Sequence, residues 1–362
     1  MAIGKYTQIG GVIKQIVGEY TQVGGVIKQI TINALGIGGA IKQVPIGEKY
    51  IWACEQSSDR LYAIDDNYTE LAGWPQYGGL IADPEEVACD DEGNSYWACW
   101  PDIYKYDIDG NKLWTYSGFG PPVTAICVDA DGFVYAGDLI GNVKKLDPSI
   151  PGGDPLCVKW ASAPYVATVH ALAVDHSAGF LYGALGQITA GRIVRFGTAV
   201  GNASLVLYKA GFEFQSIAID EGLPSLYVGD NDTDVSSPGN IRKISTAGYE
   251  YWKKSKGGEI LAVRVGHDGY GYYVNGSDGD VGKFTLATGT NVWTDQPAGT
   301  SRGLAVDAFG NVYSSHGAYG SVNAVIRKNN SSGTEQWTWQ PYINSEWRGV
   351  AVSPGIKAAG FD

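Results

Sequence analysis

The sequence predicts an all-β protein: a seven-bladed β-propeller closed by pairing of N- and C-terminal strands, preceded by a short repetitive β segment. First, an apolar strand, an Asp, a turn and a Tyr strand recur seven times between residues 50 and 353. Second, the copies lie 39 (Asp90 to Asp129) to 46 (Asp129 to Asp175) residues apart, which is typical of four-stranded propeller blades. Third, the seventh copy is split between the two ends of the array, as closure of a ring requires.

The first element, residues 1–46, contains three units that repeat every 14 residues: YTQIGGVIKQI (6–16), YTQVGGVIKQI (20–30) and LGIGGAIKQV (35–44). Each unit places β-branched residues around a Gly-Gly pair, which favours a turn between two short strands. Three such units are too small for a separate core, so their apolar stripe requires another surface. We therefore expect assembly through Ile9, Val12, Ile13, Val23, Val26, Ile27, Ile37 and Ile41.

Three alternatives are open for the surface that covers this stripe: the propeller, identical copies of the segment, or a larger assembly. A fourth alternative is that the segment is flexible. Its units are hairpins, a small solenoid or strands exchanged between chains. Short Gly-Gly β repeats before a globular head resemble the N-terminal attachment regions of bacteriophage virion proteins, such as head fibres, decoration proteins and tail adhesins. The resemblance implies a virion protein that is made in the host cytoplasm without a signal peptide, binds other virion proteins through residues 1–46 and forms a homo-oligomer.

The second element, residues 47–362, is the predicted propeller. Its first strand, KYIWACE (49–55), is expected to pair with RGVAVS (348–353), which places both ends of the ring in one blade. The other copies begin EEVACD at Glu85, TAICVD at Thr124, HALAVD at His170, QSIAID at Gln215, LAVRVG at Leu261 and RGLAVD at Arg302. Deleting the last ~15 residues is therefore expected to open the ring and expose a strand edge.

Two further strands follow each Tyr strand, as in DIYKYDIDGNKLWTY (102–116), where an Asp-Gly turn interrupts the alternation. Their terminal aromatics are Trp74, Trp114, Trp160, Tyr208, Trp252, Trp293 and Trp337. The Asp–Tyr phrase resembles the unit of NHL-like repeats, and the turn followed by Trp is similar to the tryptophan-docking unit of quinoprotein-like blades. The resemblance covers about residues 48–356 and implies the fold, whereas propellers serve as enzymes, lectins and scaffolds alike.

Composition excludes several classes of function. The net charge is −12, so a nucleic-acid partner is not expected. No stretch approaches the roughly 20 apolar residues that span a bilayer, so membrane insertion is not expected. The five cysteines show no CxxC spacing and are expected to be mainly buried free thiols.

Candidate site residues follow from the propeller frame. The position five before each recurrent Asp is expected to ring one channel mouth, and it holds Glu85, Thr124, His170, Gln215, Leu261, Arg302 and Arg348. Loops on that face are expected to display Phe119 and other aromatics beside Asp102, Asp138, Asp230 and His316. The predicted ligand-binding residues are Trp100, Tyr165, His170, Phe214, Arg302, Tyr319, Trp347 and Arg348. Such a face suits sugar stacking or a protein interface, unless the aromatics plug the ring.

No metal or other cofactor is expected at this mouth. Glu85 and His170 are too few ligands, and Arg302 and Arg348 would repel a cation. The pair Asp129 and Asp131 mimics half a calcium loop, but position 12 of that loop would be Ile140 instead of Glu, which favours a simple turn. His176 is likewise expected to be a solvated turn residue.

The expected function is a non-enzymatic structural or adhesive virion subunit, anchored by residues 1–46, with the propeller facing a host glycan or protein. A second class of function is a stand-alone carbohydrate-binding propeller, and a third class is a lactonase-like or lyase-like propeller enzyme. Glycan binding would indicate the second class, and a stoichiometric divalent ion near Glu85 and His170 would indicate the third.

Overall fold

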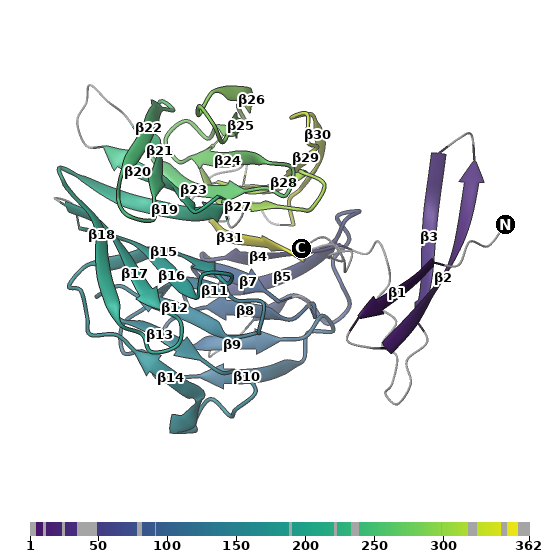
Figure 1. The fold of residues 1–362 in the computed structure, drawn as a ribbon, viewed down its shortest axis with the longest axis horizontal. Coiled ribbons are helices and arrows are strands. Elements are labelled where there is room, and N and C mark those ends of the chain that lie inside the picture. Colours follow the sequence, from purple (N-terminus) through teal and green to yellow (C-terminus); the bar gives the residue numbers. More distant parts are fainter. Residues whose placement is uncertain are drawn as a thin grey trace. The chain divides into compact units, whose positions relative to one another are not determined.

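The computed structural model describes residues 5–9, 12–23, 26–34, 49–77, 82–90, 92–187, 190–220, 223–232, 239–297, 299–317, 324–341 and 346–353. For residues 5–34, and for Gln187, Phe212 and Asp232, the description covers the backbone. The chain forms two compact units (Figure 1). One comprises Met1–Glu48 with Gly355–Asp362, and the other comprises Lys49–Pro354.

The larger unit contains seven antiparallel four-stranded sheets, which confirms the predicted seven-bladed β-propeller. Blade 1 comprises β7 (Glu86–Cys89), β8 (Ser95–Ala98), β9 (Ile103–Tyr106) and β10 (Lys112–Tyr116). Blade 2 comprises β11 (Val123–Val128), β12 (Val134–Asp138), β13 (Val143–Leu146) and β14 (Val158–Ala161). Blade 3 comprises β15 (Thr168–Asp175), β16 (Phe180–Gln187), β17 (Ala190–Gly197) and β18 (Ala203–Ala210). A short 3₁₀ helix, η1 (Pro155–Cys157), precedes β14.

The remaining blades follow the same order. Blade 4 comprises β19 (Phe212–Asp220), β20 (Ser225–Asp232), β21 (Asn240–Ser245) and β22 (Glu250–Ser255), blade 5 comprises β23 (Ile260–Val265), β24 (Tyr270–Asn275), β25 (Val281–Thr285) and β26 (Asn291–Asp295), blade 6 comprises β27 (Ser301–Val306), β28 (Val312–His316), β29 (Val325–Asn329) and β30 (Glu335–Trp339), and blade 7 comprises β31 (Trp347–Val352), β4 (Tyr50–Glu55), β5 (Arg60–Asp65) and β6 (Gln76–Tyr77).

Blade 7 closes the ring as predicted. Strand β31 pairs antiparallel with β4, with Val352 opposite Ile51 and Val350 opposite Ala53. The N–H of Ser353 donates to the carbonyl oxygen of Tyr50 at 2.9 Å. The first strands of successive blades contact one another around the ring, and β31 contacts β7 to complete the circle. Closure therefore joins residues about 300 positions apart in one sheet.

The hydrophobic core lies between blades. Seven clusters of buried side chains occupy the seven interfaces between consecutive blades, and each combines residues of two blades. Burying one apolar face of each sheet against the next gives a ring without terminal capping units. Of the five free cysteines, Cys54, Cys99 and Cys157 are buried as expected, whereas Cys89 and Cys127 are half-buried.

In blades 1, 2 and 6 the recurrent Asp and Tyr hold the turn at the start of the second strand. In blade 2, Asp129 accepts backbone hydrogen bonds from Asp131 and Phe133 on Oδ1, at 3.0 and 2.9 Å, and accepts the Tyr135 hydroxyl on Oδ2 at 2.8 Å. Asp90 and Asp307 make the corresponding bonds in blades 1 and 6. The repeated phrase is thus a structural element that fixes one turn per blade.

In five blades a repeated Trp docks the blade onto the next one. The indole N–H of Trp160 in blade 2 donates to the carbonyl oxygen of Thr198 in blade 3 at 2.9 Å. Trp74, Trp114, Trp293 and Trp337 make equivalent bonds to Ile108, Ile150, Ser331 and Asp66. These bonds tie neighbouring outer strands together, as the tryptophan-docking resemblance implies.

The smaller unit contains a three-stranded antiparallel sheet with the order β1 (Lys5–Ile9), β2 (Val12–Val23) and β3 (Val26–Ala34). Six predicted assembly residues lie in these strands: Ile9, Val12, Ile13, Val23, Val26 and Ile27. Ile9 is opposite Val12 in the first pair of strands and Val23 is opposite Val26 in the second, so the first two predicted Gly-Gly pairs fall between antiparallel strands in the sequence. Ile37, Ile41 and the Gly-Gly pairs themselves lie outside the described residues.

Candidate recognition site at the channel mouth

One face of the ring brings together two sets of loops, which we call the mouth face: the loops that enter each first strand and the loops that join the second strand to the third. Backbone hydrogen bonds connect the two sets within a blade. In blade 1, Trp100 donates to Ala82 at 2.8 Å, and in blade 2 Leu139 donates to Pro122 at 3.0 Å. The antiparallel order of each blade places all these loops at the same end of the strands.

An ion-pair network occupies the mouth face where blades 6, 7 and 1 meet. Arg348 lies 2.6 Å from Glu346 and 3.6 Å from Glu85, measured between guanidinium nitrogens and carboxylate oxygens. Its guanidinium also donates to the amide oxygen of Gln56, and the Gln56 amide donates to Glu85 at 2.7 Å. Arg302 lies 3.5 Å from Glu346. The arginines predicted to line the mouth are therefore neutralised by carboxylates of the same face.

Burial shifts the pKa values of charged groups in and beside this network. It raises the pKa of Glu85, and Arg348 partly offsets that shift. Burial also raises the pKa of Glu259, which accepts a hydrogen bond from Asn231 at 3.0 Å. Burial and the neighbouring Arg348 lower the pKa of Arg302, whose Nε atom has no hydrogen-bond partner among the described residues.

Blades 1 to 3 give the mouth face a different character. Trp100 is 46% exposed, Leu139 47%, Ile140 48% and Val166 72%. One hydrogen bond joins the loops of blades 2 and 3: the hydroxyl of Thr168 donates to the carbonyl oxygen of Leu139 at 3.2 Å. The mouth face is therefore apolar on one side and charged on the other. We call the side chains of Trp100, Leu139, Ile140 and Val166 the apolar patch.

Five of the predicted ligand-binding residues lie on or beside the mouth face: Trp100, Tyr165, His170, Arg302 and Arg348. Tyr165 is half-buried and packs edge-on against Phe196, with ring centroids 6.1 Å apart. His170 is half-buried, its Nε2 atom has no described hydrogen-bond partner, and burial lowers its pKa to about 4. His170 is therefore neutral at neutral pH. Tyr319 lies outside the described residues.

The prediction that Phe214 and Trp347 face solvent is wrong. Both side chains have no exposed surface. Phe214 packs in the core between blades 3 and 4, and Trp347 packs against Tyr62 and Trp339, with ring centroids 5.2 and 5.6 Å apart. Phe214 lies within β19 and Trp347 within β31, not in the loops before these strands. Just after each residue, the pairing with the next strand shifts register. Residues at the same place in the repeat of other blades, Val123, Val169 and Ile260, are also fully buried, so this position belongs to the strand and points into the core, whereas a loop was expected here.

Phe119, Asp138, Asp230 and His316 are also buried, contrary to expectation. Asp138 accepts turn hydrogen bonds from Ile140 and Asn142, and Asp230 forms a buried ion pair with Arg242 at 2.5 Å. These carboxylates and His316 serve internal turns and packing, so they are not available to a ligand.

His316 lies between two serine hydroxyls, but this arrangement is not an active site. Its Nδ1 is 2.7 Å from Ser301 Oγ and its Nε2 is 2.7 Å from Ser314 Oγ. Ser301 donates to the carbonyl oxygen of Gly279 at 2.6 Å, so it accepts from Nδ1–H while Ser314 donates to Nε2. All three residues are fully buried, and burial lowers the pKa of His316 to about 3. The group is a neutral, satisfied core cluster.

The central channel contains a cavity of about 340 Å³ lined by the first strands of all seven blades. Aliphatic side chains dominate the lining, with Cys89, Cys127 and one charged side chain, Arg264. Arg264 on blade 5 and Glu86 on blade 1 belong to non-adjacent blades, yet their charged atoms lie 3.9 Å apart. This pair spans the channel, and its sequence signal is a charged residue in each of two otherwise apolar inner strands.

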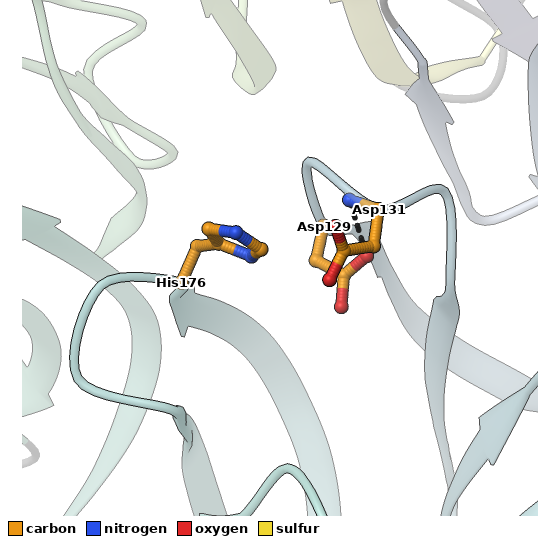
Figure 2. Close-up of side chains that lie close together, drawn as sticks. All are labelled: Asp129, Asp131 and His176. Carbon is orange, nitrogen blue, oxygen red and sulfur yellow. Dashed lines mark hydrogen bonds between the residues drawn. The ribbon is translucent and has the colours of Figure 1, made fainter. Parts of the chain in front are cut away.

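A cluster on the opposite face has the residue types of a metal site. Figure 2 shows Asp129 and Asp131 in a turn of blade 2 beside His176 from a turn of blade 3. Their ligand atoms lie within 4.8 Å of one another. Asp129, however, is already bonded to its turn and to Tyr135, and Lys145 Nζ lies 4.0 Å from it. The cluster is therefore explained by the repeated Asp turn, and His176 is exposed as expected.

Comparison with known proteins shows the fold alone. No family model matches the chain, and no curated protein matches its sequence. Among solved structures, the WD40 β-propeller domain of Doa1 has a TM-score of 0.60 at 12% identity, covering 76% of this chain and 88% of its own. The β-propeller domain of Cps50 (Swd1) from Myceliophteria thermophila has a TM-score of 0.58 at 11% identity, covering 72% and 86%.

A chain of a nidogen/laminin complex is also similar, with a TM-score of 0.53 at 11% identity, covering 85% of this chain and 99% of its own. At these identities the similarity extends to the propeller architecture and not to a ligand. Among the described residues, no helix has the length and hydrophobicity to cross a membrane.

Proposed function

We propose that this protein is a non-enzymatic structural and adhesive subunit of a phage particle. In this proposal residues 1–46 attach the chain to other virion proteins, and the mouth face of the propeller binds a host glycan or protein. The observation that carries the proposal is the division into a ring whose blades cover one another and a separate, repetitive three-stranded sheet. A segment of this length is too small to bury a core of its own, which favours a role in assembly.

The apolar patch supports recognition by the mouth face. Four apolar side chains, each 46% or more exposed, lie on the loops of three neighbouring blades. The ion-pair network of blades 6, 7 and 1 reaches the same blade as Trp100 through Glu85. Apolar contact area beside oriented charges and amides is typical of binding surfaces, where the apolar part supplies affinity and the polar part supplies orientation.

Attachment is tested by particle incorporation. We expect the full chain to enter particles and a chain beginning at Gly47 to remain soluble outside them. The shorter chain keeps Lys49, whose ammonium lies 2.6 Å from Asp307, and all of β4, so its ring is complete. Normal incorporation of the shorter chain would refute attachment through residues 1–46.

Recognition is tested by adsorption of assembled particles to host cells. Replacing Leu139 and Ile140 by Ser is expected to reduce adsorption at least about tenfold, because the lost apolar area contributes about 25 cal/mol per Å² to binding. The matched control replaces Val200 and Leu223, which are 70% and 60% exposed on turns of the opposite face. Equal adsorption by both variants would place the binding surface elsewhere.

Carbohydrate binding by the propeller alone is a second candidate, favoured by one observation. Trp100 keeps 46% of its surface exposed on the mouth face, and an exposed indole ring is suited to stacking on a sugar ring. Saturable glycan binding that is lost in Trp100→Ala and retained in Tyr249→Ala would support it. Tyr249 is 68% exposed on a turn of the opposite face, so it controls for the loss of an exposed aromatic.

A further inference from the structure

The outer edge of β3 is the feature that carries a further inference. Strand β2 lies between β1 and β3, and it pairs with β3 from Ile16 opposite Ala34 to Val23 opposite Val26. Among the described strands, none pairs with the other edge of β3. An unpaired edge presents a row of backbone donors and acceptors that another strand can complete.

This edge is longer and less protected than the opposite one. Strand β3 has nine residues, whereas β1 has five. The pairing of β2 with β3 shifts register between Thr21 and Gln22, and this shift leaves Lys28 without an opposite residue. The regular part, Gln29–Ala34, reads QITINA and has no charged residue. Charged side chains and bulges normally protect a strand edge from pairing with another strand. In β3 both lie outside Gln29–Ala34, so this stretch is unprotected.

We propose that β3 pairs antiparallel with β3 of a second copy of this chain, about a two-fold axis that passes through Gln29–Ala34. This inference rests on the proposed function, in which residues 1–46 are the attachment segment, and it names the first partner of that segment. Two-fold pairing uses the same edge on both copies, so it is closed and yields a dimer. It joins two three-stranded sheets into one sheet of six strands, which is a more stable size.

The sequence of the segment favours a second copy over an unrelated strand. Strands β2 and β3 both begin VIKQI, and they already pair antiparallel within one chain. Strands of this 14-residue repeat are therefore compatible with strands of their own kind. In a two-fold pairing centred on Gln29–Ala34, Lys28 of one copy does not lie opposite Lys28 of the other, so no like charges oppose one another across the new interface.

A cysteine scan along β3 of the full-length protein tests the proposal. Single Cys substitutions at Gln29, Ile30, Thr31, Ile32 and Asn33 are oxidised, and covalent dimer is measured on a denaturing gel. In antiparallel pairing, each step from the axis separates equivalent residues by about 7 Å more, and a disulfide requires Cα atoms less than about 7 Å apart. We therefore expect dimer to peak at one position or two adjacent positions and to decline on both sides.

Two controls define the baseline of the scan. The unsubstituted chain, with its five native cysteines, gives the dimer that arises without an engineered thiol. Residue 16 lies on the central strand, where it is paired with Lys5 on one side and Ala34 on the other. The dimer yield of Ile16→Cys is therefore expected to stay at that baseline. Equal crosslinking at all five β3 positions would indicate parallel pairing and overturn the proposal. Dimer at the baseline level for all five positions would show that something other than a second copy covers this edge, and it would also overturn the proposal.

Particle incorporation separates this inference from the proposed function. If the scan stays at baseline but the chain beginning at Gly47 fails to enter particles, attachment stands and the β3 partner is wrong. If the scan peaks but the shorter chain enters particles normally, the dimer stands and attachment through residues 1–46 is wrong.

Discussion

The propeller and the N-terminal sheet are both built from repeated strands, but they treat their strand edges differently. In the propeller, β31 returns to pair with β4, and seven interblade cores leave each inner strand enclosed. In the N-terminal sheet, the described strands end at an edge of β3 that no described strand covers. A repeat that closes on itself yields a self-sufficient domain, whereas an open repeat needs a partner. Deletions, substitutions and pH should therefore affect the two regions differently.

The largest expected difference is between two truncations. Removing residues 347–362 removes all of β31, including the fully buried Trp347. The loss should exceed the roughly 5–15 kcal/mol of a typical domain's stability, so we expect no cooperative unfolding. Removing residues 1–46 should leave the melting temperature of the propeller within a few degrees. Circular dichroism during heating measures both, and a cooperative transition in the chain lacking β31 would contradict the closure argument.

Two tryptophans sharpen the comparison within the propeller. Trp347→Ala should cost about 3–5 kcal/mol, because the side chain is fully buried against Tyr62 and Trp339. Trp100→Ala should cost less than about 1 kcal/mol, since that side chain is 46% exposed. Urea unfolding gives both values. Equal losses would mean that the assignment of these two residues to core and mouth face is incorrect.

Acid should weaken the ring and spare the N-terminal segment. Burial lowers the folded-state pKa of His170 to about 4 and of His316 to about 3. Because the unfolded chain binds protons at about pH 6.5 and the folded chain does not, their contribution to stability is complete above pH 6.5 and is lost as the pH falls. Between pH 7 and 4.5 each histidine should cost about 2.5 kcal/mol.

Residues 1–46 contain no histidine, and Glu19 is their one carboxylate. Dimerisation through this segment should therefore not follow the histidine titration. The measurements are the free energy of unfolding and the solution mass, each as a function of pH. His316→Gln should flatten the slope of the stability curve, and an unchanged slope would exclude His316 as a source of the pH dependence.

The smallest expected effect concerns the docking of one blade on the next. Trp160→Phe removes the indole bond to Thr198 and should lower stability by about 1 kcal/mol. Trp252→Phe is the matched control, because the indole N–H of Trp252 is buried without a hydrogen-bond partner among the described residues. We expect it to be neutral or slightly stabilising. Equal losses in urea would show that ring packing, not the hydrogen bond, accounts for docking.

The candidate recognition surface was only partly predictable. The positions of Arg302 and Arg348 follow from counting within the repeat, and Trp100 follows from its place after a Tyr strand. The other residues of the apolar patch were missed, although Leu139 and Ile140 form an apolar pair inside a turn, which is an available signal. The Arg264–Glu86 pair could not be found, because the contact joins two non-adjacent blades across the channel.

By itself, the sequence determined the number of blades, the closing pair of strands and the docking tryptophans. Each of these depends on a local pattern of strand, turn and aromatic residue that recurs at a fixed period, so neighbouring copies confirm one another. Only the tertiary structure decided which aromatics are exposed and which charges meet. Phe214 and Trp347 lie in strands where loops were expected, and His176 meets Asp131 because two turns of adjacent blades converge. Where each strand begins, and which side chains meet between blades, depend on packing between blades that no single copy of the repeat specifies.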